Sequence, residues 1–262
     1  MADGKLEDKL AGKIVDAEEL SQEFKEHSVA EFFKKNKQML GLYGKVRTLT
    51  TIVHEYVTNS LDACEEANIL PDIDVKLDEI GSEYYEVTVK DNGPGLTEET
   101  VGKALGKLLA GTKFHRMMQS RGQQGIGSAG CTMLSQMTTG KPVKVITGTG
   151  NKNAISLELT IDPKRNEPKI GNQTALPKDF RGLAVQAKFK GILYRDSEQG
   201  PLEYLRRTAI ANPHAQISFR DPSGQKIKFK RTVNKVPERA KVVKPHPKGV
   251  SVDEIVTLAK YT

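Results

Sequence analysis

Three polar side chains between residues 46 and 67 could do acid–base and metal chemistry. Glu55, Asn59 and Asp62 follow one another at steps of four and three residues, which places them on one face of a predicted helix. Glu55 could take a proton from an attacking water, and Asn59, one turn further on, could offer its amide oxygen to Mg²⁺. A solvated polar face would show the same spacing, so the interpretation depends on the other motifs of the chain.

An aspartate followed by a glycine-rich turn, DNGPG, is the second motif. Asp91 ends a predicted strand, where its carboxylate could accept the exocyclic amino protons of adenine. Gly93 and Gly95 permit the positive φ and the close backbone approach that a flat base requires. The alternative is a simple strand-to-helix turn closed by an Asx hydrogen bond.

A third motif, GQQGIG, stands directly before a predicted helix and could bind phosphate. Its glycines free backbone N–H groups for phosphate oxygens, and the helix N-terminus adds partial positive charge. No strand precedes the motif and no Gly-Lys-Ser/Thr follows, which disfavours a dinucleotide fold and a Walker loop. Upstream, Thr112 could donate a hydrogen bond to phosphate and Lys113 could supply a point charge, although Lys113 could equally be an exposed lysine. The candidate phosphate-binding residues are Thr112, Lys113, Gly122, Gln123, Gln124, Gly125, Ile126, Gly127, Ser128 and Ala129.

The elements that would position these residues follow from hydrophobic periodicity. The helix of residues 46–67 has a core-facing stripe at three- and four-residue steps, formed by Val46, Leu49, Val53, Val57, Ser60 and Cys64. Two alternating strands follow at residues 73–80 and 84–90, and Thr97 is placed to cap a helix over 98–111. About five further strands and two helices, at 128–138 and 201–212, complete the pattern. We expect an α+β fold, with helices on one face of a mixed, mostly antiparallel sheet.

Composition and charge exclude several classes of protein. The chain has 262 residues, of which 37% are hydrophobic and 28% charged, as in an ordinary soluble domain. No apolar run approaches the ~18 residues that span a bilayer, and the N-terminus lacks an apolar secretory segment. Cys64 and Cys131 both fall in predicted helices, so we expect no disulfide framework and a cytoplasmic location. The net charge of +7 and the pI near 9.2 permit a nucleic-acid partner without establishing one.

Residues 225–248 are strongly basic, with nine lysines and arginines and one acid, Glu238. Lys226, Lys228 and Lys230 alternate with Ile227 and Phe229, so the lysines share a strand face that points to solvent. This pattern is typical of an edge strand that lysines protect from further pairing. A surface that faces DNA would show it equally well.

The three motifs together, ExxxNSxDA, DxGxG and GxxGxG in this order, resemble the GHKL ATPase superfamily. That superfamily includes gyrase-type topoisomerases, ninety-kilodalton heat-shock chaperones, MutL mismatch-repair proteins and histidine kinases. The segments SVAEFFKKN, VHEYVTNSLDACEEANILPDI, VKDNGPGL, RGQQGIGSAGCTMLSQM and VKPHPKGV are more closely similar to the B subunits of archaeal type IIB topoisomerases (topoisomerase VI). The similarity covers about residues 28–262.

This resemblance implies a Bergerat fold, a two-layer sandwich, with ATP and Mg²⁺ as cofactors. Glu55 would be the general base, Asn59 the Mg²⁺ ligand and Asp91 the residue that binds adenine. Thr112, Lys113 and residues 122–129 would hold the phosphates. The implied function is that of the ATP-hydrolysing part of a DNA topoisomerase. It would dimerise on ATP and gate passage of double-stranded DNA, which a separate A subunit cuts within an A2B2 complex.

The resemblance also implies how the chain is divided. Residues 1–30 would form an N-terminal arm, residues 31–235 the ATP-binding domain, and residues 236–262 a linker and the start of a helix-two-turns-helix domain. A lysine from a domain beyond this chain would complete the γ-phosphate site, so we expect slow hydrolysis. Leu183 stands where the superfamily usually has a threonine close to the base.

Other GHKL proteins are the alternative. A chaperone or mismatch-repair ATPase would have the same nucleotide site and protein clients, but it would lack the flanking segments SVAEFFKKN and KPHPKGV. A sensor kinase is disfavoured because none of the five histidines falls in a dimerisation helix.

Overall fold

The computed structural model describes residues 41–108, 127–150, 153–177 and 179–238, together with residues 252 and 256. The predicted arm at residues 1–30, the candidate residues 112, 113 and 122–126, and most of the segment 236–262 lie outside this part. Their predictions remain predictions.

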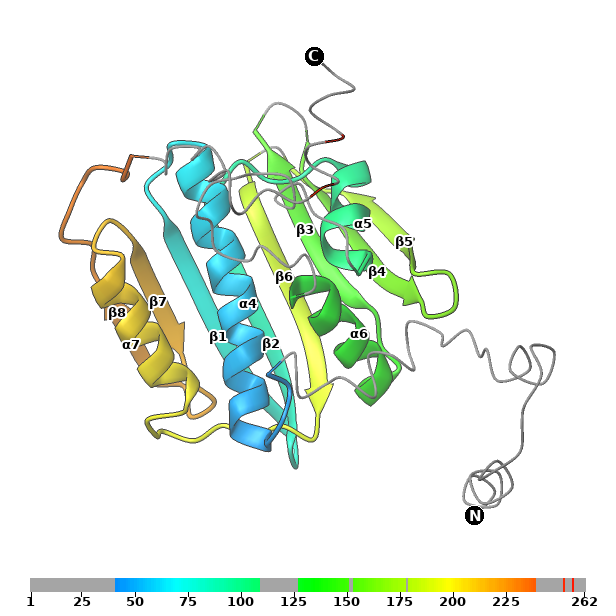
Figure 1. The fold of residues 1–262 in the computed structure, drawn as a ribbon, viewed down its shortest axis with the longest axis horizontal. Coiled ribbons are helices and arrows are strands. Elements are labelled where there is room, and N and C mark those ends of the chain that lie inside the picture. Colours follow the sequence, from blue (N-terminus) through cyan, green and yellow to red (C-terminus); the bar gives the residue numbers. More distant parts are fainter. Residues whose placement is uncertain are drawn as a thin grey trace.

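One eight-stranded sheet organises the described residues (Figure 1), with the strand order β5-β4-β3-β6-β2-β1-β7-β8. Of its seven strand pairs, β1 and β7 run parallel and the other six run antiparallel. The strands are β1 (Asp72–Gly81), β2 (Tyr84–Asp91), β3 (Val143–Thr149), β4 (Ile155–Asp162), β5 (Glu167–Ala175), β6 (Arg181–Lys190), β7 (Gln216–Arg220) and β8 (Lys226–Phe229).

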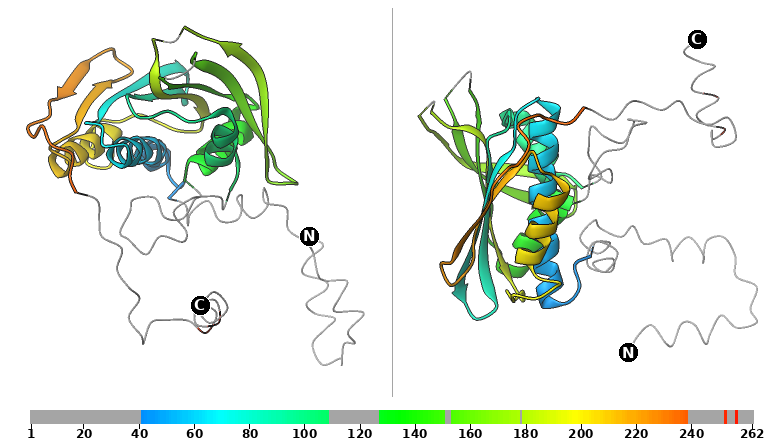
Figure 2. Two further views of the ribbon diagram at one scale, coloured as in Figure 1. Left: turned by 90° about the horizontal axis from the view of Figure 1, so that it is seen from above. Right: turned by 90° about the vertical axis from the view of Figure 1, so that its left-hand side faces the viewer.

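Four helices cover one face of this sheet and leave the other face bare of described helices (Figure 2). They are α4 (Lys45–Glu66), α5 (Glu98–Gly106), α6 (Gly127–Thr139) and α7 (Pro201–Ala211). The long helix α4 lies over β1 and β2, with α6 on one side of it and α7 on the other. The α+β class, with helices on one face of a mixed sheet, is therefore confirmed.

The core lies between the helices and the inner face of the sheet. Alternating residues of β1 and β2 point into it, as predicted, because successive side chains of a strand face opposite ways. The α4 stripe is also buried as predicted, apart from Val46, which is not buried. These core residues of β1, β2 and α4 are Ile73, Val75, Leu77, Tyr85, Val87, Val89, Leu49, Ile52, Val53, Tyr56, Val57, Leu61 and Cys64. Both cysteines are free and buried, and no helix among the described residues is long and apolar enough to cross a bilayer.

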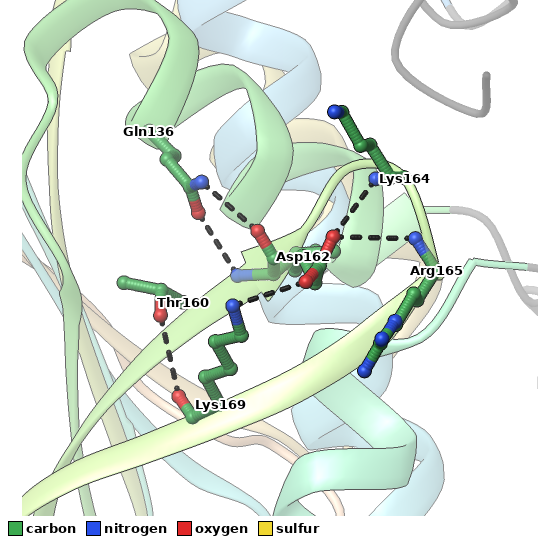
Figure 3. Close-up of polar contacts among 7 residues, drawn as sticks. Gln136, Thr160, Asp162, Lys164, Arg165 and Lys169 are labelled. Carbon is green, nitrogen blue, oxygen red and sulfur yellow. Dashed lines mark hydrogen bonds and ion pairs between the residues drawn. The ribbon is translucent and has the colours of Figure 1, made fainter.

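Hydrophobic alternation does not predict strand β5, because its residues, EPKIGNQTA, are mostly polar. The position of β5 depends on the preceding turn, which is stabilised by side-chain hydrogen bonds and an ion pair (Figure 3). Asp162 accepts hydrogen bonds from the backbone N–H groups of Lys164 (2.9 Å) and Arg165 (3.2 Å) and pairs with Lys169 at 3.0 Å. These contacts lower the pKa of Asp162 to about 2, with Lys169 contributing most.

Helix α5 begins where predicted but ends earlier. Thr97 caps it by accepting a hydrogen bond from the backbone N–H of Thr100, whereas the helix stops at Gly106 rather than continuing to residue 111. Beyond it, Leu108 is held by Asn166 of the β4–β5 turn, whose amide accepts from the Leu108 N–H (3.0 Å) and donates to its carbonyl (2.9 Å). The backbone groups of Leu108 thus find a tertiary partner in place of a helical one.

Candidate nucleotide-binding site

Asp91 lies at the end of β2, buried beneath the C-terminal half of α4. Its Oδ2 accepts a hydrogen bond from the Ser60 hydroxyl at 2.8 Å, and its Oδ1 accepts from the backbone N–H groups of Gly93 (2.9 Å) and Leu183 (3.1 Å). Burial raises the pKa of the Asp91 carboxyl, and these three donors act in the opposite direction. A carboxylate offers about four acceptor positions, so three bonds fix its orientation and leave capacity for one further donor.

Ser60 belongs by its spacing to the apolar stripe of α4, and that spacing does not reveal its contact with Asp91. The side chain is buried, and its hydroxyl points from the inner face of the helix to the end of β2. The contact depends on how α4 packs on the sheet, and the local spacing of residues does not predict that packing.

The two glycines of DNGPG are required for different reasons. Gly95 has φ +69°, and a Cβ there would lie 2.4 Å from the carbonyl oxygen of Gly148. Gly93 does not have a positive φ, so that part of the prediction is wrong. A Cβ on Gly93 would instead lie 3.0 Å from Asp91 Oδ1 and 3.3 Å from Cys64 Sγ. A side chain at Gly95 would therefore collide with the backbone of β3, and one at Gly93 would press on the side chains of Asp91 and Cys64.

Two polar side chains that the motifs did not single out hold this turn. Thr147 of β3 is buried, and its hydroxyl accepts from the Leu96 N–H at 2.7 Å and donates to the Leu96 carbonyl at 2.8 Å. The Asn92 amide bridges the start of β1, accepting from the Asp72 N–H (2.9 Å) and donating to the Leu70 carbonyl (3.1 Å). Asp91 is thus presented by a loop that is fixed on both sides.

Glu55 and Gly127 meet where α6 begins beside α4. A Cβ on Gly127 would lie 1.7 Å from Glu55 Oε2, so a side chain at this position would displace the Glu55 carboxylate from the start of the helix. Burial raises the pKa of Glu55, and neighbouring His54 lowers it by a smaller amount. The carboxylate therefore lies next to a helix N-terminus, whose N–H groups favour negative charge.

Asn59 lies one turn further along α4 and contacts the same part of α6. Its Nδ2 donates to the Ser128 hydroxyl at 3.0 Å, and that hydroxyl also approaches the Ala104 carbonyl at 3.4 Å. The amide oxygen of Asn59 is not taken up by another described residue, so it can accept a donor or coordinate a cation. Asp62, predicted on the same polar face, is buried.

The described part of the predicted phosphate loop consists of Gly127, Ser128 and Ala129. The first two lie next to Glu55 and Asn59, and Ala129 is buried in the core. The structure therefore brings together the predicted base, the predicted cation ligand and the end of the glycine motif. The other candidates lie outside the described residues: Thr112, Lys113, Gly122, Gln123, Gln124, Gly125 and Ile126.

No cluster of three or more histidine, cysteine, aspartate or glutamate side chains that could hold a metal occurs in the described ranges. Mg²⁺ usually keeps several waters and binds one or two protein oxygens together with substrate phosphates. The Asn59 amide oxygen is suited to be one of these few protein ligands of Mg²⁺.

The chain is similar to several known proteins over most of its length. Residues 44–164 match the family described as histidine kinase-, DNA gyrase B-, and HSP90-like ATPase. The B subunit of type 2 DNA topoisomerase 6 from Pyrococcus horikoshii is 50% identical over 248 residues, which are 94% of this chain and 44% of that protein. Its counterpart from Methanothermobacter thermautotrophicus is 48% identical over 242 residues, 91% of this chain and 46% of that protein.

Over nearly its whole length the chain is homologous to the B subunits of type 2 DNA topoisomerase 6. It spans less than half the length of these relatives, since the Thermococcus kodakarensis member, 50% identical over 95% of this chain, is covered to 44%. The family resemblance drew attention to Leu183, whose side chain cannot donate a hydrogen bond. The backbone N–H of Leu183 donates one to Asp91 instead.

Proposed function

We propose that this chain binds and hydrolyses ATP as the nucleotide-binding part of the B subunit of a type IIB DNA topoisomerase. The observation that carries the proposal is the presence of two carboxylates in different surroundings. Asp91 is buried and fixed by three donors, whereas Glu55 is partly buried against Gly127 and has a raised pKa. The first suits recognition of a base, and the second suits proton transfer.

Recognition of adenine follows from the remaining acceptor capacity of Asp91. The exocyclic amino group of adenine donates a hydrogen bond, whereas guanine carries a carbonyl oxygen at the equivalent position. A buried carboxylate facing that oxygen would leave two acceptors opposed and unpaired, which costs about 1–3 kcal/mol. The site should therefore prefer ATP to GTP.

Hydrolysis would use Glu55 as general base and Asn59 as cation ligand. A carboxylate whose pKa is raised by burial is a stronger base, in its ionised form, than an ordinary carboxylate, and so takes a proton from water more readily. Mg²⁺ held by the Asn59 amide oxygen would neutralise charge on the phosphates. The residues 112, 113 and 122–129 are proposed to hold those phosphates.

The finer parts of the proposal come from the relatives. We propose that ATP binding makes two copies of the chain dimerise, that a separate A subunit cleaves the double-stranded DNA, and that the two kinds of chain form an A2B2 complex. The chaperone and mismatch-repair alternatives share the nucleotide site, but identity of about 50% to topoisomerase 6 B subunits favours the topoisomerase.

Isothermal titration of the 262-residue chain with ATP in the presence of Mg²⁺ tests the proposal. We expect saturable binding of one ATP per chain and at least about tenfold weaker binding of GTP, the ratio that 1.4 kcal/mol gives. Equal affinity for the two nucleotides would contradict the role of Asp91, and absence of binding at millimolar ATP would contradict the proposed function.

A further inference from the structure

Strand β8 forms one edge of the sheet and carries a row of lysines on the face that no described helix covers. Lys226 pairs with Arg220 of β7, and Lys228 pairs with Ser218. The alternate residues Ile227 and Phe229 are half-buried and pack against the core. The exposed residues Lys226, Lys228 and Lys230, the last of which directly follows β8, are here named the β8 lysine row. Because Ile227 and Phe229 face the core, alternation along the strand places Lys226 and Lys228 on the opposite face of the sheet.

The row has no ion-pair partner among the described acidic residues, although the exposed Asp74 of β1 lies on the same face of the sheet, separated from Lys228 by Ser218 of β7. None of its three lysines forms an ion pair with any residue in the described part of the chain. Asp221, at the turn before β8, is buried and accepts hydrogen bonds from the Ser223 hydroxyl and the Gln225 N–H.

On the same face of β1, Asp78 is already bound to Lys76 at 2.6 Å and to Arg220 at 2.8 Å. Burial is the largest single influence on the pKa of Asp78 and raises it, but the hydrogen bonds and charges of these two partners together lower it. Asp78 is therefore an ionised carboxylate that is already paired within the sheet and is not available to the β8 lysine row.

The spacing of the row suits a polyanion with closely spaced charges. Alternate residues of a strand are about 6.6–6.8 Å apart, so three lysines extend over about 13 Å. Duplex DNA carries one charge per about 1.7 Å of its axis, and a row of this length lies alongside several phosphates. The positive charge continues through Arg231 and Lys235, with no acid between residues 225 and 237.

We propose that the β8 lysine row binds the phosphate backbone of duplex DNA, independently of base sequence. The inference goes beyond the proposed nucleotide site and rests on the proposed topoisomerase function for its choice of DNA over an acidic polypeptide. Lysines on an edge strand also discourage pairing with other strands. That effect accounts for the lysines of β8 itself but not for the continuation of charge past its end.

Fluorescence anisotropy with a labelled duplex of mixed sequence, measured over a series of salt concentrations, tests the proposal on the 262-residue chain. The variant K226Q/K228Q/K230Q removes the row, and K103Q/K141Q/K164Q removes three exposed lysines from other parts of the molecule with the same change in net charge. Each lost phosphate contact lowers the slope of log K against log salt by about 0.9. We expect the row variant to lower it by about 2.7 and to weaken binding at least about tenfold at moderate salt, with the control close to the parent.

Labelled polyglutamate serves as the probe for an acidic polypeptide in the same assay. Three outcomes would overturn the inference: no DNA binding by the parent, equal losses of DNA affinity in the two variants, or a row variant that loses affinity for polyglutamate but keeps its affinity for DNA. ATP titration of the same variants separates this test from the proposed function, because neither set of lysines contacts Asp91, Glu55 or Asn59. A row variant that binds ATP normally but has lost DNA affinity supports the inference. A parent that binds DNA but not ATP would contradict the proposed function alone.

Discussion

Asp91 and Glu55, the two carboxylates of the proposed site, lie in different surroundings. Asp91 is buried and held by hydrogen bonds from Ser60, Gly93 and Leu183. Glu55 lies against a glycine at the start of a helix, in a setting shaped mainly by close packing. Substitutions that preserve size should therefore affect binding at the first position and chemistry at the second.

Replacing Asp91 by asparagine should weaken ATP binding and leave the fold intact. The amide would place a donor, or a single weaker acceptor, opposite the adenine amino group. The unpaired polar groups cost about 1–3 kcal/mol, equivalent to a loss of affinity of about five- to more than a hundredfold. Titration calorimetry measures the loss, with Asp74→Asn on the exposed face of β1 as the control. Unchanged affinity in D91N would reduce Asp91 to a turn residue.

Replacing Glu55 by glutamine should slow hydrolysis by about a hundredfold or more, because the amide cannot accept the proton of water. ATP affinity should stay within a few-fold, since size and hydrogen bonding are kept. Single-turnover hydrolysis measures the effect, and Glu66→Gln, an exposed position on the same helix, is the matched control. Equal rates in E55Q and the parent would remove Glu55 as the base.

The pH dependence of hydrolysis should report the same residue. A general base acts only when ionised, and burial raises the pKa of Glu55. The rate should therefore fall as pH drops through this raised pKa, at a higher pH than the ~4.3 of an ordinary glutamate. The hydrolysis rate of E55Q should not show this fall at acidic pH. A fall that persists in E55Q would report the titration of another group.

Loops and strands determine whether these side chains are presented correctly. The turn after β2 carries Asp91 and is joined to β3 by the two hydrogen bonds between Thr147 and Leu96. Gly95 of this turn allows close backbone contact with β3 and β6. The Asp91 carboxylate is therefore positioned by neighbouring strands as much as by its own strand.

Replacing Thr147 by valine should lower the free energy of unfolding by about 1–3 kcal/mol, because the Leu96 N–H and carbonyl lose a buried partner. ATP affinity should also fall, since the turn that holds Asp91 loses its link to β3. Chemical denaturation and calorimetry measure the two effects. Thr160→Val is the control: its hydroxyl makes one exposed contact of 3.4 Å, so its effect should stay within about 0.5 kcal/mol. Equal losses of stability in the two variants would contradict the role of Thr147.

At the scale of the whole molecule, the site joins parts that lie far apart in the sequence. Helix α4 contributes Glu55 and Asn59, β2 contributes Asp91, and α6 contributes Gly127. A ligand that contacts all of them binds the folded state and not the unfolded one. ATP should therefore stabilise the sheet and its helices together.

Adding ATP and Mg²⁺ at about a hundred times Kd should stabilise the fold by about 2.7 kcal/mol. For a domain of this size that corresponds to a rise in Tm of about 5–10 °C. Differential scanning calorimetry measures the rise, and GTP at the same concentration should give a smaller one. An unchanged Tm, with ATP binding seen by titration, would mean that ATP binds away from these elements.

The sequence alone determined the features that depend on local periodicity and turn chemistry. The two faces of α4, the strand that ends at Asp91, and the cap at Thr97 are all predicted from spacing, because each is formed by residues close in the chain. The order of the three motifs was sufficient to indicate the family, and thereby the roles of Glu55 and Asn59 as hypotheses.

Only the tertiary structure decided the contacts between distant segments. Strand β5 lacks a periodic pattern and is positioned by Asp162 and its neighbours, and Asn166 takes the backbone groups of Leu108 beyond the end of α5. By its spacing Ser60 is only a core position of α4, yet its hydroxyl orients Asp91. By its spacing Thr147 is only a strand residue, yet its hydroxyl holds the turn that follows Asp91. Such roles depend on which surfaces meet when the helices pack on the sheet, and hydrophobic spacing records burial without recording the partner.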